Sequence, residues 1–194
     1  MDRDSELALV ARLRDGDPDA FDCVHAYFNT RLFNFLARLS RRREVAEDLL
    51  EETWLRLVAR AAQLRPDTHL GPWLFTVARN LYVSYRRSRM LEDSHAVGLD
   101  GLWPSGSPQP SPFEVAAAGE AGRRLETALG GLPVAYREAI LLVAIEGLQP
   151  SEAAEVCGIK PEAMRQRLSR ARAALAVSLA SDESTLAALR EVPT

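Results

Sequence analysis

The fold of this chain is decided by the stretch Pro150-Ser-Glu-Ala-Ala-Glu-Val-Cys-Gly-Ile-Lys-Pro-Glu-Ala-Met-Arg-Gln-Arg-Leu-Ser-Arg-Ala-Arg172. A proline stands at each of two positions where a helix can begin, and Gly158 lies between them, where a tight turn requires a residue that tolerates positive φ. After the second proline, apolar residues recur every three or four positions, at Met164, Leu168, Ala171 and Leu175. The pattern predicts a helix over 150–156, a turn, and a second helix from 161, which together form a helix-turn-helix.

The opposite face of the second helix is polar and basic. It carries Glu162, Arg165, Gln166, Ser169 and Arg170. Arginine and glutamine at the start of such a helix can reach base edges in the major groove, and the helix N-terminus favours a phosphate. The stretch therefore predicts DNA binding, although an ordinary helical hairpin with solvated arginines would have the same residues.

Outside this stretch, nearly every segment has the apolar period of a helix, and no β-alternation is sustained. We therefore expect an all-α protein. The expected helices cover about 5–15, 18–39, 44–58 and 72–90 in the first half, and 113–129, 133–145, 150–156 and 161–180 in the second. Asp17 and Pro18 have the cap and first-turn chemistry of a helix start.

The helical period is lost over residues 92–112, where glycine, proline and serine crowd together. This composition predicts a flexible linker. The stretch Ser111-Pro-Phe-Glu114 has the form of a capping box and marks the next helix start. The chain is thus expected to form two small helical domains, 1–91 and 113–180, with the helix-turn-helix in the second, and a tail over 181–194.

Composition places the chain among ordinary soluble proteins, with 194 residues, 47% hydrophobic and 26% charged. Its longest apolar run, over 139–145, is too short to cross a bilayer, and no secretory signal precedes the first helix. We therefore expect a cytoplasmic protein without membrane insertion. Cys23 and Cys157 lie far apart and outside any zinc-ligand spacing, so both are expected to be reduced core residues.

Basic residues form two clusters although the net charge is −3. The stretch 76–91 contains arginines without an acidic residue and is followed by an acidic stretch over 92–122. The second cluster surrounds the start of the last helix, where Lys160, Arg165, Arg167, Arg170 and Arg172 face one acid, Glu162. Two basic clusters on an acidic chain favour two nucleic-acid surfaces over solvated helix faces.

Catalytic chemistry is not indicated. His25, His69 and His95 are scattered over an early helix, a loop and the linker, and no nucleophile, base and orienting group come together in sequence. We expect no enzyme activity, no metal site, no cofactor and no small-molecule substrate.

Three further motifs occur in a fixed order: Ala46-Glu-Asp-Leu-Leu-Glu-Glu-Thr-Trp-Leu-Arg-Leu57, Pro72-Trp-Leu-Phe-Thr-Val-Ala-Arg-Asn80, and Leu132-Pro133 with Arg137 ahead of Arg170-Ala-Arg172. With these motifs the chain resembles the extracytoplasmic-function (ECF) sigma factors of the sigma-70 family, over about 5–90 and 113–180. The resemblance implies a bacterial transcription-initiation subunit that binds core RNA polymerase and directs it to promoter DNA. It also implies an anti-sigma factor as a partner.

The resemblance further implies three surfaces. The segment 48–57 would bind polymerase through Asp48, Leu49, Glu51, Glu52, Thr53 and Leu57. The segment 73–89 would open and read the minus-ten element through Arg79, Asn80, Tyr82, Tyr85, Arg86 and Arg87, with the loop 65–70 building a base pocket and Trp73 and Leu74 in the core. The last helix would read the minus-thirty-five element through Lys160, Glu162, Arg165, Gln166, Ser169 and Arg170.

One alternative from another class remains. An ordinary helix-turn-helix regulator, with a sensing or dimerising first domain, would bind its operator without core polymerase. It leaves the motifs at 46–57 and 72–80 without an explanation.

Overall fold

In the computed structural model, which describes residues 1–96 and 119–190, every regular element is a helix. The all-α prediction is confirmed. In chain order the elements are α1 (Arg3–Arg14), α2 (Pro18–Ser40), α3 (Arg43–Arg60), the short 3-10 helix η1 (Ala61–Gln63), α4 (Leu70–Ala96), α6 (Glu120–Gly131), α7 (Val134–Ile140), the π-helical η2 (Leu141–Ile145), α8 (Pro150–Cys157) and α9 (Pro161–Arg190).

The first two helices are set by their caps. Asp2 accepts a hydrogen bond from the Ser5 amide at 3.0 Å, so α1 begins two residues before the predicted start. Gly16 follows with a φ of 77°, the left-handed turn expected there. Asp17 accepts from the Asp19 amide at 2.9 Å and caps α2, as predicted.

The helix α4 is longer than predicted at both ends. It starts at Leu70 rather than Pro72, because a carboxylate of α1 accepts the Leu70 amide hydrogen at 2.8 Å. It runs to Ala96, so residues 92–96 are helical and the expected linker does not begin at 92. The remainder of that linker, and the capping box expected at Ser111–Glu114, lie outside the described residues.

The core of the first half forms between α2, α3 and α4. Phe35 of α2 and Phe75 of α4 are fully buried and meet edge to face, with ring centroids 5.2 Å apart. From α3, the core receives Val45, Ala46, Leu49, Thr53, Trp54 and Leu57. Val58, which follows Leu57 directly, is 61% exposed, because the helix turns it away from α2 and α4.

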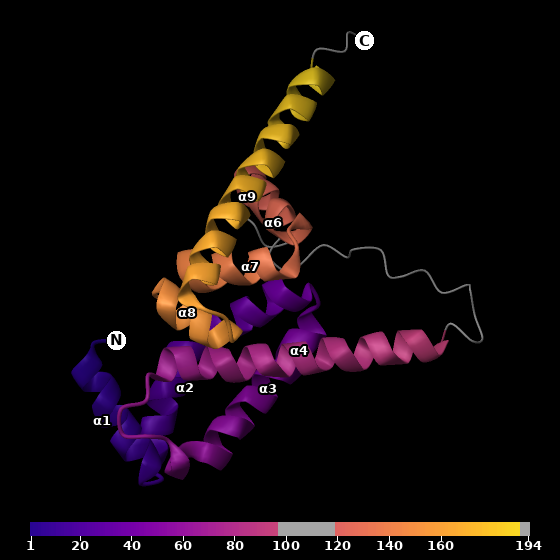
Figure 1. Ribbon diagram of the computed structural model, residues 1–194. Coiled ribbons are helices and arrows are strands. Elements are labelled where there is room, and N and C mark those ends of the chain that lie inside the picture. The colour runs from indigo at the N-terminus through magenta and orange to yellow at the C-terminus, as the bar shows by residue number, and fades with distance from the viewer. Residues whose placement is uncertain (97–118, 191–194) are drawn as a thin grey trace.

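The second half contains the helix-turn-helix. Glu152 accepts from the Gln149 amide at 2.8 Å at the start of α8, and Gly158 ends α8 with a φ of 65°. The final helix α9 passes the predicted end at residue 180 and continues to Arg190, so residues 181–190 of the expected tail are part of this helix. Its far part projects away from the other helices (Figure 1).

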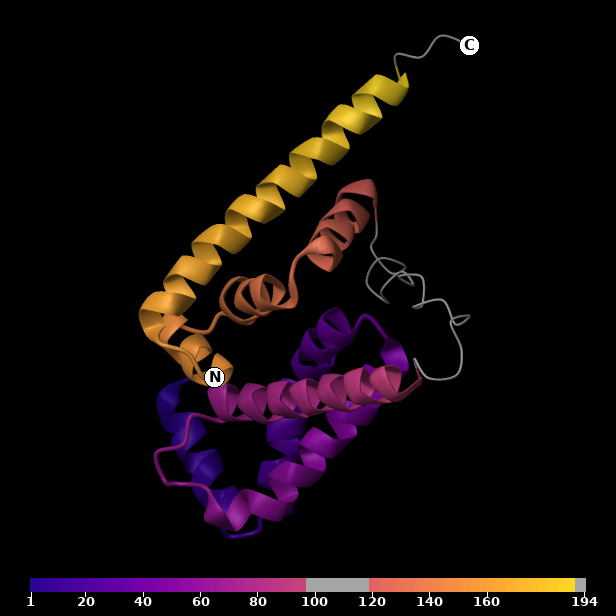
Figure 2. The same ribbon diagram turned by 45° about the vertical axis from the view of Figure 1, so that its right-hand side comes forward.

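The two halves lie directly against each other rather than apart. The helix α8 packs on the N-terminal part of α4, and α7 lies near α2, as both views show (Figures 1 and 2). Buried apolar residues of both halves belong to one continuous cluster.

The cysteine prediction is half right. Cys157 is buried, but Cys23 is exposed, because it faces outward from α2. Over residues 1–96 and 119–190, no helix is both long and apolar enough to cross a membrane.

Adjacent residues of α3 give a test of this packing. Leu57→Ala should lower the free energy of unfolding by about 2–5 kcal/mol, because Leu57 is fully buried and its loss leaves a cavity. Val58→Ala should change it by less than about 0.5 kcal/mol, because that side chain already contacts solvent. Urea unfolding followed by helical circular dichroism measures both, and equal losses would contradict the placement of α3.

Candidate nucleic-acid and protein interfaces

The start of α9 presents the basic face that the sequence predicted. The six residues named for the minus-thirty-five element are all exposed: Lys160, Glu162, Arg165, Gln166, Ser169 and Arg170. The opposite side of the helix is anchored by Met164, Leu168 and Ala171, which are buried. Arg165 forms a 3.0 Å ion pair with Glu162 on the same face. The helix is therefore anchored through its buried side, and its charged side is accessible to solvent and to a nucleic-acid groove.

On α3, the residues named for polymerase binding divide into two groups. Asp48 and Glu51 are exposed and Glu52 is half-buried. Leu49, Thr53 and Leu57 are buried against α2 and α4, and the Thr53 hydroxyl donates to the Leu49 carbonyl at 2.7 Å. The packing of α3 thus makes these three side chains core residues, so they offer no exposed surface to polymerase, contrary to the expectation for this segment.

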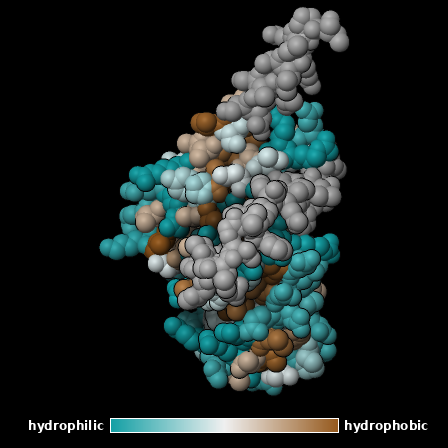
Figure 3. Space-filling view, turned by 90° about the vertical axis from the view of Figure 1, so that its right-hand side faces the viewer, coloured by the Kyte–Doolittle hydropathy of each residue, from teal (hydrophilic) through white to brown (hydrophobic). Residues whose placement is uncertain are grey.

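A different set of apolar residues reaches the surface beside the acidic groups. A groove of about 360 Å³ is lined by Phe21, Leu50, Trp54, Leu55, Val58, Glu47 and Glu51. Leu55 is 57% exposed. Phe21, Leu55 and Val58 were not predicted for this surface, although two apolar residues three positions apart on one charged helix face, Leu55 and Val58, were a signal for it. Hydrophobic side chains also gather low on the face shown in Figure 3, where the first half lies.

On α4, the residues named for the minus-ten element are only partly accessible. Asn80, Arg86 and Arg87 are exposed and Tyr85 is half-buried. Tyr82 is 4% exposed, and its hydroxyl donates to the Leu39 carbonyl at 2.9 Å. This burial raises the pKa of Tyr82 above its ordinary value. In this arrangement the Tyr82 ring is a core group and offers no stacking face.

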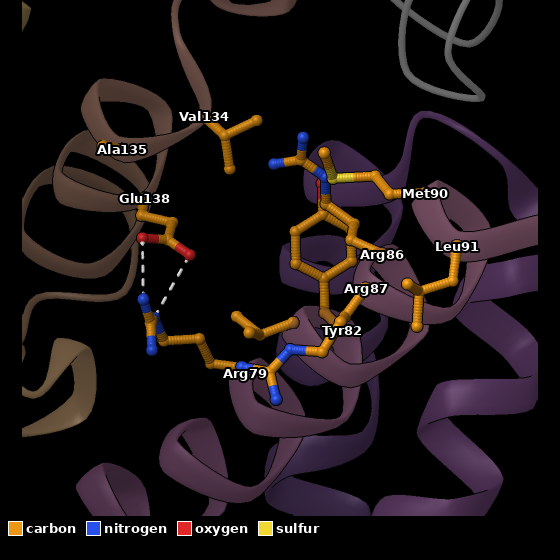
Figure 4. Close-up of a pocket in the computed structure, with 10 residues that line it drawn as sticks. Arg79, Tyr82, Arg86, Arg87, Met90, Leu91, Val134, Ala135 and Glu138 are labelled. Atoms are coloured by element: carbon orange, nitrogen blue, oxygen red, sulfur yellow. Dashed lines mark hydrogen bonds and ion pairs between the residues drawn. The ribbon is translucent and has the colours of Figure 1, made fainter. Parts of the chain in front are cut away.

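Arg79 is held by the second half of the chain. Its Nε atom lies 3.1 Å from Oε1 of Glu138 on α7, and Glu138 is 3% exposed (Figure 4). The pair closes one side of a crevice of about 610 Å³ between α4 and α7, which is lined by Arg79, Tyr82, Val83, Arg86, Arg87, Met90, Leu91, Val134, Ala135 and Glu138. Several of the minus-ten residues therefore line the junction between the halves.

Two more ion pairs cross the same junction. Nη2 of Arg38 on α2 lies 2.8 Å from Oε1 of Glu126 on α6, and both side chains are largely buried. Nε of Arg31 lies 2.9 Å from Oε2 of Glu146, and its Nη2 atom donates to the Glu146 carbonyl at 2.7 Å. Burial raises the pKa of Glu146, and the hydrogen bond from Arg31 opposes that effect.

Arg137 joins the two halves through backbone carbonyls. From α7, its guanidinium donates to Leu129, Gly130 and Leu132 at the end of α6, and to Arg38 and Leu39 at the end of α2. Carbonyls at a helix C-terminus lack intrahelical partners and carry partial negative charge, so one cation serves two helix ends. Arg137 was part of a sequence motif, but its contact with α2 depends on residues about a hundred positions earlier and could not be predicted.

The loop before α4 is held by α1. Arg3 donates from Nη2 to the Asp67 carbonyl at 2.8 Å and from Nη1 to the Thr68 carbonyl at 3.3 Å. Glu6 accepts the amide hydrogen of Leu70. The loop side chains Arg65, Pro66, Asp67 and His69 remain exposed.

Two of the three histidines have described side chains, and that of His95 lies outside the described part of the chain. Nδ1 of His69 lies 3.8 Å from Glu6 and 4.0 Å from Glu152 of α8, while the His25 ring packs 4.8 Å from the Trp54 ring. In the described part of the chain, no three His, Cys, Asp or Glu side chains are placed to hold a metal ion.

Two known family models match the chain, one on each side of the stretch between α4 and α6. Residues 25–91 match the model of sigma-70 region 2, and residues 122–175 match that of sigma-70 region 4.

Similar proteins cover both halves together. The RNA polymerase sigma factor CarQ of Myxococcus xanthus is 35% identical over 162 residues, which are 83% of this chain and 90% of that protein. The ECF RNA polymerase sigma factor EcfG of Rhodopseudomonas palustris is 34% identical over 149 residues, or 76% of this chain and 78% of that protein. Among solved structures, the sigma factor RpoE of Bartonella quintana, in complex with the anti-sigma factor NepR, aligns with a TM-score of 0.69 and 28% identity, covering 84% of this chain and 98% of that one.

The two cysteines allow a chemical test of how deeply Cys157 is buried. Burial, reinforced by the nearby Glu138 carboxylate, raises the pKa of Cys157 to about 11, so only roughly a thousandth of it is thiolate at pH 8. Iodoacetamide at pH 8 should therefore modify the exposed Cys23 at least about a hundredfold faster than Cys157, as measured by peptide mass spectrometry. In denaturant the two rates should converge. Equal rates in the native protein would contradict the burial of Cys157.

Proposed function

The chain belongs to the ECF group of the sigma-70 family, and we propose that it is a sigma factor that binds core RNA polymerase, directs it to specific promoters and promotes transcription initiation. The observation that carries this function is the exposed basic face of α9, fixed from behind by the core of a helix-turn-helix, in a chain that also matches region 2. A regulator that acts without polymerase would leave the region 2 match unexplained.

We propose a separate binding function for each half of the chain. Residues 1–91 bind polymerase and the minus-ten element, residues 113–180 bind the minus-thirty-five element, and the chain between them connects the two. The protein works in the cytoplasm, where polymerase and promoter DNA are, and has no catalytic activity of its own. RpoE of Bartonella quintana was solved with an anti-sigma factor, and by similarity we propose such a partner for this chain.

Polymerase binding is proposed for the outer face of α3. Asp48, Glu51 and Glu52 offer carboxylates, and the groove beside them offers Leu55 and Val58 as apolar contacts. Acidic groups around an apolar groove suit a partner helix that carries basic residues beside an apolar one. Leu49, Thr53 and Leu57 support this face from beneath, because they fix α3 in the core.

DNA reading is proposed for two faces. On α9, Arg165 and Gln166 lie in the first two turns, where side chains reach base edges, and Lys160 and Arg170 suit phosphates. On α4, Asn80, Tyr85, Arg86 and Arg87 are accessible groups that can hold unstacked bases and the strand backbone. Arg79 becomes available only if the second half moves away from α4, whereas Tyr82 is held within the first half by the Leu39 carbonyl of α2.

The proposed function requires that movement. The two promoter elements are about 25 base pairs apart, or roughly 85 Å at about 3.4 Å per base pair. In the structure the two halves touch through Arg79 and Glu138, at 3.1 Å. A packed molecule cannot place one half on each element, so we propose that the halves separate when the protein binds polymerase and promoter.

The function is tested by run-off transcription with purified bacterial core RNA polymerase, a genomic-fragment library, and sequencing of the new start sites. We expect discrete starts that share two upstream elements and that require both the protein and the core enzyme. Glu51→Lys should lower the affinity for core polymerase by at least about tenfold, because it places like charges together at the contact. Glu120→Lys, the same charge reversal on an exposed site of α6, should leave the affinity unchanged.

One result of this experiment would refute the proposed function. If the protein shows no core binding and no new start sites, but shifts a specific duplex unaided, it is an ordinary helix-turn-helix regulator.

Separation of the halves gives a further prediction. The combined substitution Glu126→Gln, Glu138→Gln and Glu146→Gln should increase the radius of gyration in X-ray solution scattering, because each change removes an ion pair across the junction and weakens it by about 1–3 kcal/mol. The matched control is Glu47→Gln, Glu52→Gln and Glu162→Gln, which removes three ion pairs that lie within single helices. Equal radii for the two triple variants would contradict a junction held by these pairs.

A further inference from the structure

The loop between η1 and α4 is fixed from outside its own helices. Its first part contains one internal backbone hydrogen bond, from the Thr68 amide to the Arg65 carbonyl at 3.0 Å. The exposed ion pair between Arg65 and Asp67 adds little rigidity, since both side chains contact solvent. The firmest contacts of the loop come instead from α1, more than sixty residues earlier in the chain.

Arg3 holds the carbonyl side of the loop. Its guanidinium spans two consecutive carbonyls, those of Asp67 and Thr68, and it also pairs with Glu6 one turn along α1. Two donors of one planar group on neighbouring carbonyls set the direction of both peptide units. The backbone at Asp67 and Thr68 therefore has a defined orientation, while the side chains of Arg65, Asp67 and His69 remain exposed.

Glu6 holds the amide side of the loop. Its Oε1 atom accepts from the Leu70 amide at 2.8 Å, which is the first amide of α4. A carboxylate at this position acts as a helix cap and interacts favourably with the positive end of the helix dipole. The cap comes from another helix, because residue 69, where a local cap would stand, is a histidine that itself lies 3.8 Å from Glu6. The Glu6 side chain is 13% exposed, so this contact is shielded from solvent.

We propose that Arg3 and Glu6 are positioning residues for base recognition in the minus-ten element, because they hold the loop 65–70 in the shape that receives an unstacked base. This inference rests on the proposed function, in which that loop builds the base pocket. A flexible loop would have to be ordered at the moment of base capture, and the entropy of that ordering would weaken binding. The contacts from α1 order the loop in advance and keep its exposed face constant from one binding event to the next.

Substitutions in α1 distinguish a role in positioning the loop from a general effect on the stability of the protein. Glu6→Ala removes the acceptor for Leu70, whereas Glu6→Gln keeps an oxygen at the same place. Arg3→Ala removes both donors, whereas Arg3→Lys retains a single cationic donor. Asp4→Ala is the matched control, because Asp4 is an exposed acidic residue in the same helical turn.

The experiment uses the full chain assembled with core polymerase and a promoter identified by the run-off assay. Open-complex formation is measured on that promoter and on a panel with each minus-ten base changed in turn. We expect Glu6→Ala and Arg3→Ala to reduce open-complex formation by about tenfold and to flatten the preference at the captured base by a similar factor. Glu6→Gln should restore most of that preference, and Asp4→Ala should behave like the unsubstituted protein. Affinity for core polymerase should stay near that of the unsubstituted protein, and the thermal midpoint of Glu6→Ala should fall by only a few degrees, because one helix cap is lost.

The three ways in which the experiment can fail are distinguishable. If the unsubstituted protein forms no promoter-specific open complex, the proposed function fails and this inference falls with it. If it does so, but the alanine variants keep their base preference or lose activity equally on every promoter of the panel, the positioning role is refuted while the function stands. The positioning role is also refuted if Glu6→Gln restores no more base preference than Glu6→Ala.

Discussion

Arg137 is the contact on which the arrangement of this molecule depends. Its guanidinium satisfies the carbonyl ends of α6 and α2 at once, and thereby ties the helix-turn-helix half to the first half. The buried guanidinium is stabilised there by the carbonyls of helix C-termini, which carry partial negative charge. Beside this contact, Gly130 leaves room for the Arg41 side chain, since a Cβ added to it would lie 2.8 Å from the guanidinium carbon of Arg41.

The ion pairs around Arg137 have a consequence for function. Each of the three places an arginine of the first half against a glutamate of the second, and one of those arginines is Arg79, a candidate DNA ligand. The contacts that hold the packed form thus use a group that the proposed DNA-bound form needs. When the halves separate, the three arginines can exchange their glutamate partners for acidic groups of polymerase or phosphates of DNA.

The three candidate surfaces differ in how well the sequence predicted which of their side chains are exposed. The face of α9 was predicted completely, because a helical period and a proline start suffice to say which side chains lie opposite Met164 and Leu168. On α3, the carboxylates were predicted correctly as surface groups, but Leu49, Thr53 and Leu57 are core residues. On α4, Asn80, Arg86 and Arg87 are exposed, whereas Tyr82 is buried and Arg79 is occupied.

The sequence by itself determined the helices, their order and the helix-turn-helix. These features depend on caps, prolines, turn glycines and apolar spacing within a few residues, so local chemistry is enough to specify them. Only the tertiary structure decided which face of α3 is covered. It also decided that Arg79 forms an ion pair with Glu138 of α7, and that Arg3 and Glu6 hold a loop more than sixty residues away. A period shows which side chains share a face, but the partner that covers that face is set by the packing of helices distant in sequence. That partner is not encoded in any short stretch.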